Sequence, residues 1–444
     1  MSRTAVDPPA GPSAGAAGAS EGPNRWLILV AGVLVQLAIG AVYAWSVFAK
    51  ALQSPDAFGW SKSQAAVPFE VAIGMIFLGS FIGGRIQDRR GPRMVALTGG
   101  VVYSIGVILA SFAGKDQFWL LILGYGVLGG FGLGMAYIVP IAMLQKWFPD
   151  KPGLITGIAV AGFGFGAVIT APLGQRLINL DPTVPTKAFL PLGIGYLVAI
   201  LIGASLFRNP PAGFTVPGGA PAATSASGEQ PTTDRRDFEA DEALRTPQWY
   251  LLTAILTLSV TAGISLISVA AGSASDVAGL SAAGAATLVG VLGLFNGGGR
   301  ILWGWLSDRI GKMPAFMGIL GIQGVCLLLI PHASSTVLFA VLAALVYTCY
   351  GGAFGTMPST AGRFFGVRNA GAIYGLMLIG WSIGGIVGPL LISGLIGSDK
   401  AYTLGFTVVG IIALVGMALP LLTRPPSPRA VAPEEARPRQ SLRD

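Results

Sequence analysis

Long apolar runs separated by short charged segments constrain the fold of this chain more than any other feature. The first runs from Trp26 to Phe48, and five more occupy about residues 66–86, 94–113, 118–144, 153–173 and 188–207. After a polar stretch, six further runs occupy about residues 249–271, 284–306, 314–331, 336–358, 370–395 and 402–423. A helix of about 20 apolar residues crosses the hydrocarbon core of a bilayer. The sequence therefore predicts an all-α membrane protein with twelve transmembrane helices.

The composition agrees with a polytopic membrane protein. Only 11% of the 444 residues are charged, whereas a soluble domain has about 25%. The 65 glycines suit the close helix packing found in lipid. The two cysteines, Cys326 and Cys349, fall inside apolar runs, so we expect them to be buried packing residues rather than a disulfide.

The distribution of lysine and arginine predicts the topology. Of the 28 basic residues, 21 lie in the two tails, the even-numbered loops and the long linker, six lie in the odd-numbered loops, and one is Arg300. The positive-inside rule then places both termini and the linker in the cytoplasm, with the chain in the plasma membrane. The net charge of +8 is spread over these loops, a pattern of membrane topology and not of a nucleic-acid surface.

This reading divides the chain into five parts. We expect a disordered cytoplasmic N-terminal tail (1–25), a six-helix bundle (26–207), a cytoplasmic linker (208–248), a second six-helix bundle (249–423) and a disordered cytoplasmic C-terminal tail (424–444).

The two halves repeat one motif at an offset of 220 residues. It reads Gly-x-x-x-Asp-Arg-x-Gly, and its members are Gly84, Asp88, Arg89, Gly91, Gly304, Asp308, Arg309 and Gly311. Glycine lets two helices approach closely, and the aspartate can pair with a neighbouring arginine or cap a helix N-terminus. We therefore predict that each loop is a conformational latch between the bundles, the alternative being an ordinary cytoplasmic turn. The register of the two copies indicates an internal duplication.

Twelve spans in two sixes, the long linker and this duplicated loop resemble the major facilitator superfamily. The resemblance implies two pseudo-symmetric six-helix bundles that rock about a central site, giving alternating access. Three stretches look more narrowly like the oxalate/formate antiporter family, which is related to the monocarboxylate transporters. They are Gly40-Ala-Val-Tyr-Ala-Trp-Ser-Val-Phe48, Lys146-Trp-Phe-Pro-Asp-Lys-Pro-Gly-Leu-Ile-Thr-Gly157 and Gly371-Ala-Ile-Tyr-Gly-Leu-Met377.

Arg300 is the clear intramembrane charge. A guanidinium in hydrocarbon costs a few kcal/mol or more and is usually functional. Its repeat position, 220 residues earlier, is Ser80, so the charge is not a duplicated structural feature. A guanidinium forks onto a carboxylate through two hydrogen bonds, which predicts an anion site. Asn296, one turn earlier, would bind the same anion or orient the arginine. The alternative is that Arg300 snorkels to the cytoplasm.

Further polar and aromatic side chains in the spans are candidates for the same substrate site. Tyr43 and Tyr137 are the strongest, because the resemblance implies that spans 1 and 4 line the pore. The full set is Gln36, Tyr43, Trp45, Tyr137, Asn296, Arg300, Tyr347, Trp381 and Ser382. Glu70 would carry a coupled proton or lie solvated at a helix mouth, and His332 is expected to be exposed.

Span 11 departs from the antiporter pattern. Oxalate antiporters of that family pair the arginine with a lysine in span 11, whereas here span 11 is uncharged and Trp381 stands at about that place. A second carboxylate of a dianion would stay uncompensated in low dielectric. The sequence therefore favours monocarboxylates such as formate, lactate or pyruvate.

Several alternatives stay open at this stage. They are oxalate:formate exchange proper, a drug or solute efflux pump of the same fold, and antiport against proton symport. We expect the partners to be a small organic anion, a coupled proton or counter-anion and the lipid bilayer, and the protein to be monomeric. No catalytic constellation or metal-ligand spacing is visible, so neither an enzyme nor a cofactor or metal is predicted.

Overall fold

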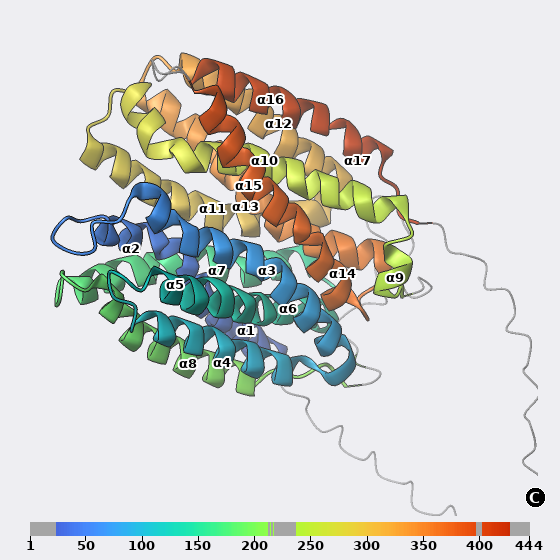
Figure 1. The fold of residues 1–444 in the computed structure, drawn as a ribbon. Coiled ribbons are helices and arrows are strands. Elements are labelled where there is room, and N and C mark those ends of the chain that lie inside the picture. Colours follow the sequence, from blue (N-terminus) through green and yellow to red (C-terminus); the bar gives the residue numbers. More distant parts are fainter. Residues whose placement is uncertain (1–23, 212–213, 215, 217–236, 397–401, 427–444) are drawn as a thin grey trace, which may run out of the picture.

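The computed structural model describes residues 24–211, 214, 216, 237–396 and 402–426, and every regular element in these ranges is a helix. Two bundles lie side by side (Figure 1), one built from α1 to α8 and the other from α10 to α17. Most of the predicted N-terminal tail, linker and C-terminal tail falls outside the described residues.

The first bundle contains the six spans predicted between residues 26 and 207. The label η marks segments of 3-10 helix and, for η2, of π-helix. In chain order the elements of this bundle are α1 (Arg25–Ile39), η1 (Gly40–Ala44), α2 (Trp45–Leu52), α3 (Lys62–Arg90), α4 (Pro92–Ala110), α5 (Phe118–Leu121), η2 (Ile122–Gly129), α6 (Gly130–Trp147), α7 (Pro152–Ile178), η3 (Pro185–Ala188) and α8 (Phe189–Ser205).

The second bundle follows the short helix α9 (Ala240–Ala243). Its elements are α10 (Pro247–Asp276), α11 (Ala282–Ile310), α12 (Lys312–Leu329), η5 (Ile330–His332), α13 (Thr336–Phe365), α14 (Ala370–Met377), α15 (Ile379–Leu395), α16 (Thr403–Gly416) and α17 (Ala418–Leu422).

Eleven helical segments of the described chain are long and apolar enough to cross a membrane. The 29-residue α11, which carries Arg300, is the remaining long helix and completes the twelve. Several helices extend beyond the ends of the apolar runs that predicted them. For example, the run 336–358 lies within α13, which continues to Phe365. The apolar run ends where polar and charged side chains begin, but the backbone hydrogen bonds of the helix continue past that point.

Two spans predicted as continuous helices are interrupted near candidate site residues. Span 1 passes through a 3-10 segment, Gly40–Ala44, which contains Tyr43. A Cβ atom on Gly40 would collide with the carbonyl oxygen of Phe163 on α7, so only glycine allows this backbone contact. Span 11 is divided at Leu378, between α14 and α15 and three residues before Trp381.

The duplicated loops have the same backbone form in both halves. Gly91, with φ of 89°, ends α3, and Gly311, with φ of 94°, ends α11. L residues rarely adopt this left-handed region, which explains the last glycine of each motif. The next helix begins at once, at Pro92 in one half and at Lys312 in the other.

Helices from both bundles form the interface between them. The α7 helix packs against α11 and α13, and α3 packs against α14 and α15, which agrees with their neighbouring positions in Figure 1. Each contact joins one half of the duplication to the other. Cys326 and Cys349 are buried free thiols, as the sequence predicted.

Candidate substrate site

Arg300 lies at the interface between the two bundles and is almost fully buried, with 1% of its surface exposed. Its Nη1 donates to the carbonyl oxygen of Val160 on α7, at 3.2 Å, and thus reaches across from α11 to the other bundle. Its Nε donates to Oδ1 of Asn296 at 3.4 Å. The guanidinium therefore does not snorkel to the solvent.

The second terminal nitrogen of Arg300 has no hydrogen-bond acceptor among the described residues. Nη2 is buried and unpartnered, and none of the ion pairs found in the described chain includes Arg300. A buried, uncompensated guanidinium is costly. The arrangement is thus suited to an anion that would accept hydrogen bonds from Nη2 of Arg300.

Aromatic rings enclose the guanidinium from both halves of the protein. Its central carbon lies 5.7 Å from the ring centroid of Phe163 on α7 and 5.2 Å from that of Phe354 on α13. These distances are within the range of cation–π attraction. The two rings hold the positive charge while offering no competing acceptor, so they position it without neutralising it.

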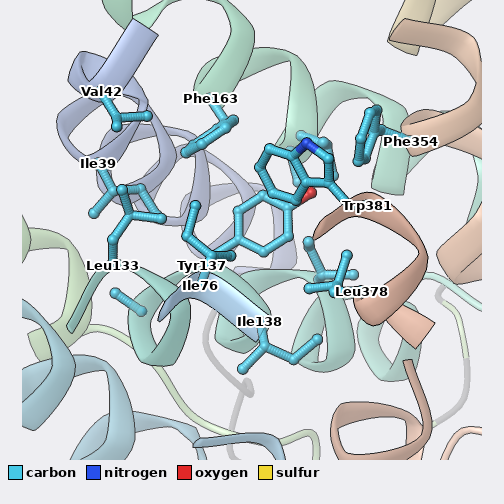
Figure 2. Close-up of a cluster of buried hydrophobic side chains, with 14 of the residues drawn as sticks. Ile39, Val42, Ile76, Leu133, Tyr137, Ile138, Phe163, Phe354, Leu378 and Trp381 are labelled. Atoms are coloured by element: carbon cyan, nitrogen blue, oxygen red, sulfur yellow. The ribbon is translucent and has the colours of Figure 1, made fainter. Parts of the chain in front are cut away.

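Trp381 and Tyr137 extend this aromatic wall. The ring centroid of Trp381 lies 4.9 Å from that of Phe354 and 6.0 Å from that of Tyr137. Tyr137 in turn packs edge-on against Phe163 at 5.0 Å. Figure 2 shows these four side chains converging, with Ile39, Val42 and Leu133 on the side of Phe163 and Tyr137 that faces away from Phe354. Trp381, which stands where the oxalate antiporter pattern has a lysine, therefore contributes an aromatic ring to this wall.

Four tyrosines supply hydroxyl groups beside this wall. The charge of Arg300 acts on the hydroxyls of Tyr137, Tyr350 and Tyr374, and Tyr43 interacts with all three. Each of the four hydroxyl oxygens is buried and lacks a hydrogen bond of ordinary geometry, and the hydroxyls interact with one another in two pairs, Tyr137 with Tyr374 and Tyr43 with Tyr350. Unsatisfied buried hydroxyls are uncommon in folded proteins and often mark a binding site. Together with Nη2 they form a group of donors suited to an anion.

Gln36 contacts the backbone of Tyr137. It is fully buried, and its Nε2 donates to the backbone oxygen of Tyr137 at 3.1 Å. Its Oε1 has no partner in the described chain. The structure thus brings six of the nine predicted residues together, namely Arg300, Asn296, Tyr43, Tyr137, Gln36 and Trp381.

The other three predicted residues lie elsewhere. Trp45 donates from Nε1 to the backbone oxygen of Ala65 at 2.8 Å and packs against Tyr125. Tyr347 is buried in a separate apolar cluster within the second bundle. Ser382 is partly buried on α15, one residue beyond Trp381. Glu70 is exposed on α3 and His332 is exposed in η5.

Sequence reasoning missed Phe163, Phe354, Tyr350 and Tyr374. Tyr374 lay within the motif Gly371–Met377 and was available there as a signal. Tyr350 follows Tyr347 on the same helix by three residues, and nothing in the sequence indicates which of the two faces the other bundle. The phenylalanines gave no signal, because apolar rings are expected throughout a membrane span.

The two predicted latch aspartates make reciprocal contacts across the interface. Asp308 on α11 accepts from the backbone N–H groups of Gly153 and Leu154, at 3.0 and 2.9 Å, at the N-terminus of α7. Asp88 on α3 accepts from the N–H of Ala372 in α14 at 2.8 Å. Of the two mechanisms considered, the structure thus shows helix capping rather than pairing with the motif arginine.

The remaining motif residues fit the same geometry. A Cβ on Gly84 would collide with the carbonyl oxygen of Gly371, and one on Gly304 with that of Gly153. The guanidinium of Arg309 lies over the ring of Trp305, 4.0 Å from its centroid, and Arg89 is exposed. The first glycine and the aspartate of each motif therefore contact the other bundle.

The two capping sites are unequal. Lys312 donates to Asp308 at 2.7 Å, and its buried ammonium also bonds to the hydroxyls of Ser307 and Ser359. At Asp88 the nearest ammonium is that of Lys146, 4.0 Å from Oδ1. Asp308 is thus the more strongly held of the two carboxylates.

Comparison with known proteins agrees with this architecture. The model of the Major Facilitator Superfamily matches residues 26–389. The oxalate:formate antiporter of Oxalobacter formigenes is 29% identical over 416 residues, covering 92% of this chain and 93% of that protein. Apicoplast pyruvate carrier 1 of Toxoplasma gondii is 25% identical, covering 93% and 91% of the two chains. Monocarboxylate transporter 13 of Rattus norvegicus is 26% identical, covering 91% and 90%.

A solved structure shows the same fold. The fucose:proton symporter FucP of E. coli superposes with a TM-score of 0.67, covering 90% of this chain and 98% of that one, at 16% sequence identity. The family match over most of the chain, together with the twelve-helix fold and the duplicated motif, shows that this chain belongs to the major facilitator superfamily and is a multi-pass membrane transporter of small molecules.

Proposed function

We propose that this transporter carries small monocarboxylate anions such as formate, lactate or pyruvate by alternating access. One observation carries the proposal: a buried guanidinium whose Nη2 has no acceptor in the described chain, enclosed by aromatic rings. One carboxylate neutralises one guanidinium, and both oxygens can accept from it. The tyrosine hydroxyls around Arg300 supply further donors to the same oxygens.

The surroundings of Arg300 favour one carboxylate over two. The described side chains around its guanidinium, Asn296, Phe163, Phe354 and Tyr137, are uncharged. Trp381, at the expected place of a second cation, packs into the same wall. A second carboxylate would be desolvated without a counter-charge, at a cost of several kcal/mol. The names of the relatives include formate together with oxalate, pyruvate, and monocarboxylates.

The two bundles would rock about this site. Arg300 and Val160 belong to opposite bundles, so an anion at Nη2 would lie where the bundles meet. Asp88 and Asp308 cap helices of the opposite bundle on the side that the charge distribution predicts to be cytoplasmic. In this proposal both are latches that hold that side closed and release when it opens.

Competition for uptake tests the substrate class. Proteoliposomes containing the purified protein would be loaded with unlabelled formate, and uptake of labelled formate would be measured with lactate, pyruvate and oxalate as competitors. We expect the monocarboxylates to compete strongly and oxalate weakly. Oxalate competing better than every monocarboxylate would contradict the proposal and favour oxalate:formate exchange.

A charge added to span 11 tests the reason for this selectivity. Trp381→Lys would place a second cation beside Arg300, so we expect oxalate to compete at least tenfold better relative to formate, because a paired charge is worth about 1.5–3 kcal/mol. Trp381→Phe keeps the wall apolar and serves as the matched control. An unchanged oxalate-to-formate ratio in the lysine variant would show that the charge count does not set selectivity.

Coupling is decided by a separate measurement. Liposomes without internal substrate would be given an inward proton gradient. Uptake under this condition identifies proton symport, whereas uptake only with internal anion identifies exchange. A wild-type protein that takes up none of the carboxylates under either condition, yet exports dyes or drugs, would overturn the carboxylate proposal in favour of an efflux pump.

A further inference from the structure

One end of α3 carries a basic groove that the transport site does not use. The groove encloses about 460 Å³, and Arg85, Arg89 and Arg90 form its polar part. Its apolar part is formed by Phe81, Ile82 and Ile86 of α3 and by Met94 of α4. Positions 81, 85 and 89 and positions 82, 86 and 90 are two neighbouring rows on one helix face. Each row begins with an apolar side chain and ends with an arginine.

The groove is open to the surroundings of the protein. Ile82 is 40% exposed and Met94 is 41% exposed, and Arg89 and Arg90 are both exposed. In a membrane-spanning bundle, exposed apolar side chains contact acyl chains. Arginines at the end of such a helix lie at the level of the lipid headgroups. The groove therefore runs from acyl-chain depth to headgroup depth.

The internal duplication shows that the fold does not require these charges. At an offset of 220 residues, Arg85 corresponds to Trp305, Arg89 to Arg309, and Arg90 to Ile310. The one arginine of that copy is engaged, because its guanidinium lies over the Trp305 ring. Both copies end their helix at a positive-φ glycine and cap the opposite bundle, so this loop geometry does not itself require Arg85 and Arg90.

Neighbouring acidic groups leave two of the three arginines available. Arg85 pairs with Asp241 of α9, Nη2 to Oδ2, at 3.7 Å. The Asp88 carboxylate accepts from the N–H of Ala372. Asp88, Glu239 and Asp241 line an adjoining small cavity together with Arg85 and Arg89. Within the described chain, neither Arg89 nor Arg90 forms an ion pair.

We propose that this groove is a binding site for one anionic phospholipid. The phosphate lies between the guanidinium groups of Arg89 and Arg90, which can each donate two parallel hydrogen bonds to it. An acyl chain lies along Ile82, Ile86 and Met94. A soluble phosphate would use only the first part of the groove, and a neutral lipid only the second. The combination selects an anionic lipid.

Native mass spectrometry of the full chain tests the proposal. The protein would be reconstituted in vesicles of equal phosphatidylglycerol and phosphatidylcholine, extracted in mild detergent, and the retained lipid identified. We expect wild type to retain phosphatidylglycerol preferentially, and Arg89→Gln/Arg90→Gln to lower that preference by about fivefold for each guanidinium lost. Arg309→Gln, the repeat counterpart, is the matched control and should keep the preference.

Equal retention of the two lipids by wild type, or an unchanged preference in the double variant, would overturn the proposal. A second variant, Ile86→Trp, fills the groove without changing any charge and should also reduce retention. Full retention by this variant, or displacement of the lipid by millimolar glycerol phosphate, would show that only the headgroup is bound. Either result would overturn the proposal that the groove binds a whole phospholipid. Gel filtration of each variant confirms that it is folded.

Discussion

At the scale of single residues, the arrangement around Arg300 combines two costs that a folded chain usually avoids. The guanidinium is 1% exposed with one terminal nitrogen unpartnered, and four buried tyrosine hydroxyls nearby lack hydrogen bonds of ordinary geometry. An anion bound there, as proposed, would relieve both costs, because its oxygens would accept from these donors. A residue set that is destabilising when empty and satisfied when occupied is the physical signature of a binding site.

Arg300→Lys separates fork geometry from charge. Lysine keeps the positive charge but cannot offer the planar fork or its contacts with Asn296 and Val160. We expect the apparent affinity for formate to fall by tenfold to a hundredfold, corresponding to about 1.5–3 kcal/mol for a hydrogen bond to a charged group. The measurement is uptake against formate concentration in proteoliposomes. Arg424→Lys, on the exposed end of the described chain, is the control. Wild-type affinity in the Arg300 variant would refute the proposed anion site.

At the scale of helices, the three consecutive glycines before Arg300 have different functions. A Cβ on Gly299 would collide with the backbone oxygen of Thr348 on α13, whereas one on Gly298 meets no atom within 4 Å. Gly299 therefore sets the spacing of α11 and α13, which carry Arg300 and Phe354. Only one of the three is needed for backbone approach between these helices, because Gly297 faces the ring of Phe165.

Gly299→Ala and Gly298→Ala form a matched pair of adjacent helix positions. Alanine favours a helix over glycine by about 1 kcal/mol, so we expect Gly298→Ala to keep or slightly raise thermal stability. Gly299→Ala must push α13 away and should lower both stability and formate uptake. Thermal unfolding of the detergent-solubilised variants measures this. Equal unfolding temperatures would argue against backbone contact between α11 and α13.

The stronger latch contact allows a test at the same scale. Asp308→Asn leaves the 5%-exposed Lys312 ammonium without its carboxylate, and we expect a loss on the order of 2 kcal/mol or more. Asp308→Asn/Lys312→Met removes both charges and should recover part of that loss, since the cost lies mainly in the orphaned charge. The free energy of unfolding of both variants is the measurement. A double variant no more stable than the single one would show that the ion pair itself is not the source.

At the scale of the whole molecule, the duplication gives both bundles one architecture but not one chemistry. The arginine of the candidate site is on α11, and its counterpart on α3 is Ser80, which donates to the backbone oxygen of Gly134 within its own bundle. The latch loops, by contrast, are used twice and reciprocally. Duplication therefore supplies the contacts on which rocking would depend, and divergence supplies the site.

The predicted topology belongs to this scale. Because 21 of 28 basic residues lie in the tails, the even loops and the linker, we expect both termini to be cytoplasmic. Green fluorescent protein fused after Asp444 should fluoresce in a bacterial host, and alkaline phosphatase fused there should be inactive. The matched fusion within the loop between α7 and η3, near Asp181, should give the opposite result. Phosphatase activity at Asp444 would contradict the predicted orientation.

The sequence by itself determined the number of spans, the internal repeat and the existence of one intramembrane cation. Each of these is written in local composition or in a fixed offset, and apolar runs of about 20 residues leave a chain few alternatives to a spanning helix. Arg300, Asn296 and the two capping aspartates could also be identified from local sequence, because their side chains differ chemically from their neighbours.

Only the tertiary structure decided which side chains share the site. Tyr350 and not Tyr347 lies near Arg300, Trp45 packs with Tyr125, and Phe163 and Phe354 enclose the guanidinium from opposite bundles. These choices depend on the rotation of each helix and on contacts between residues 50 to 137 positions apart. Apolar and aromatic residues occur on every face of a membrane helix, so the face that meets the other bundle is set by packing between helices and has no signal in the sequence of either one.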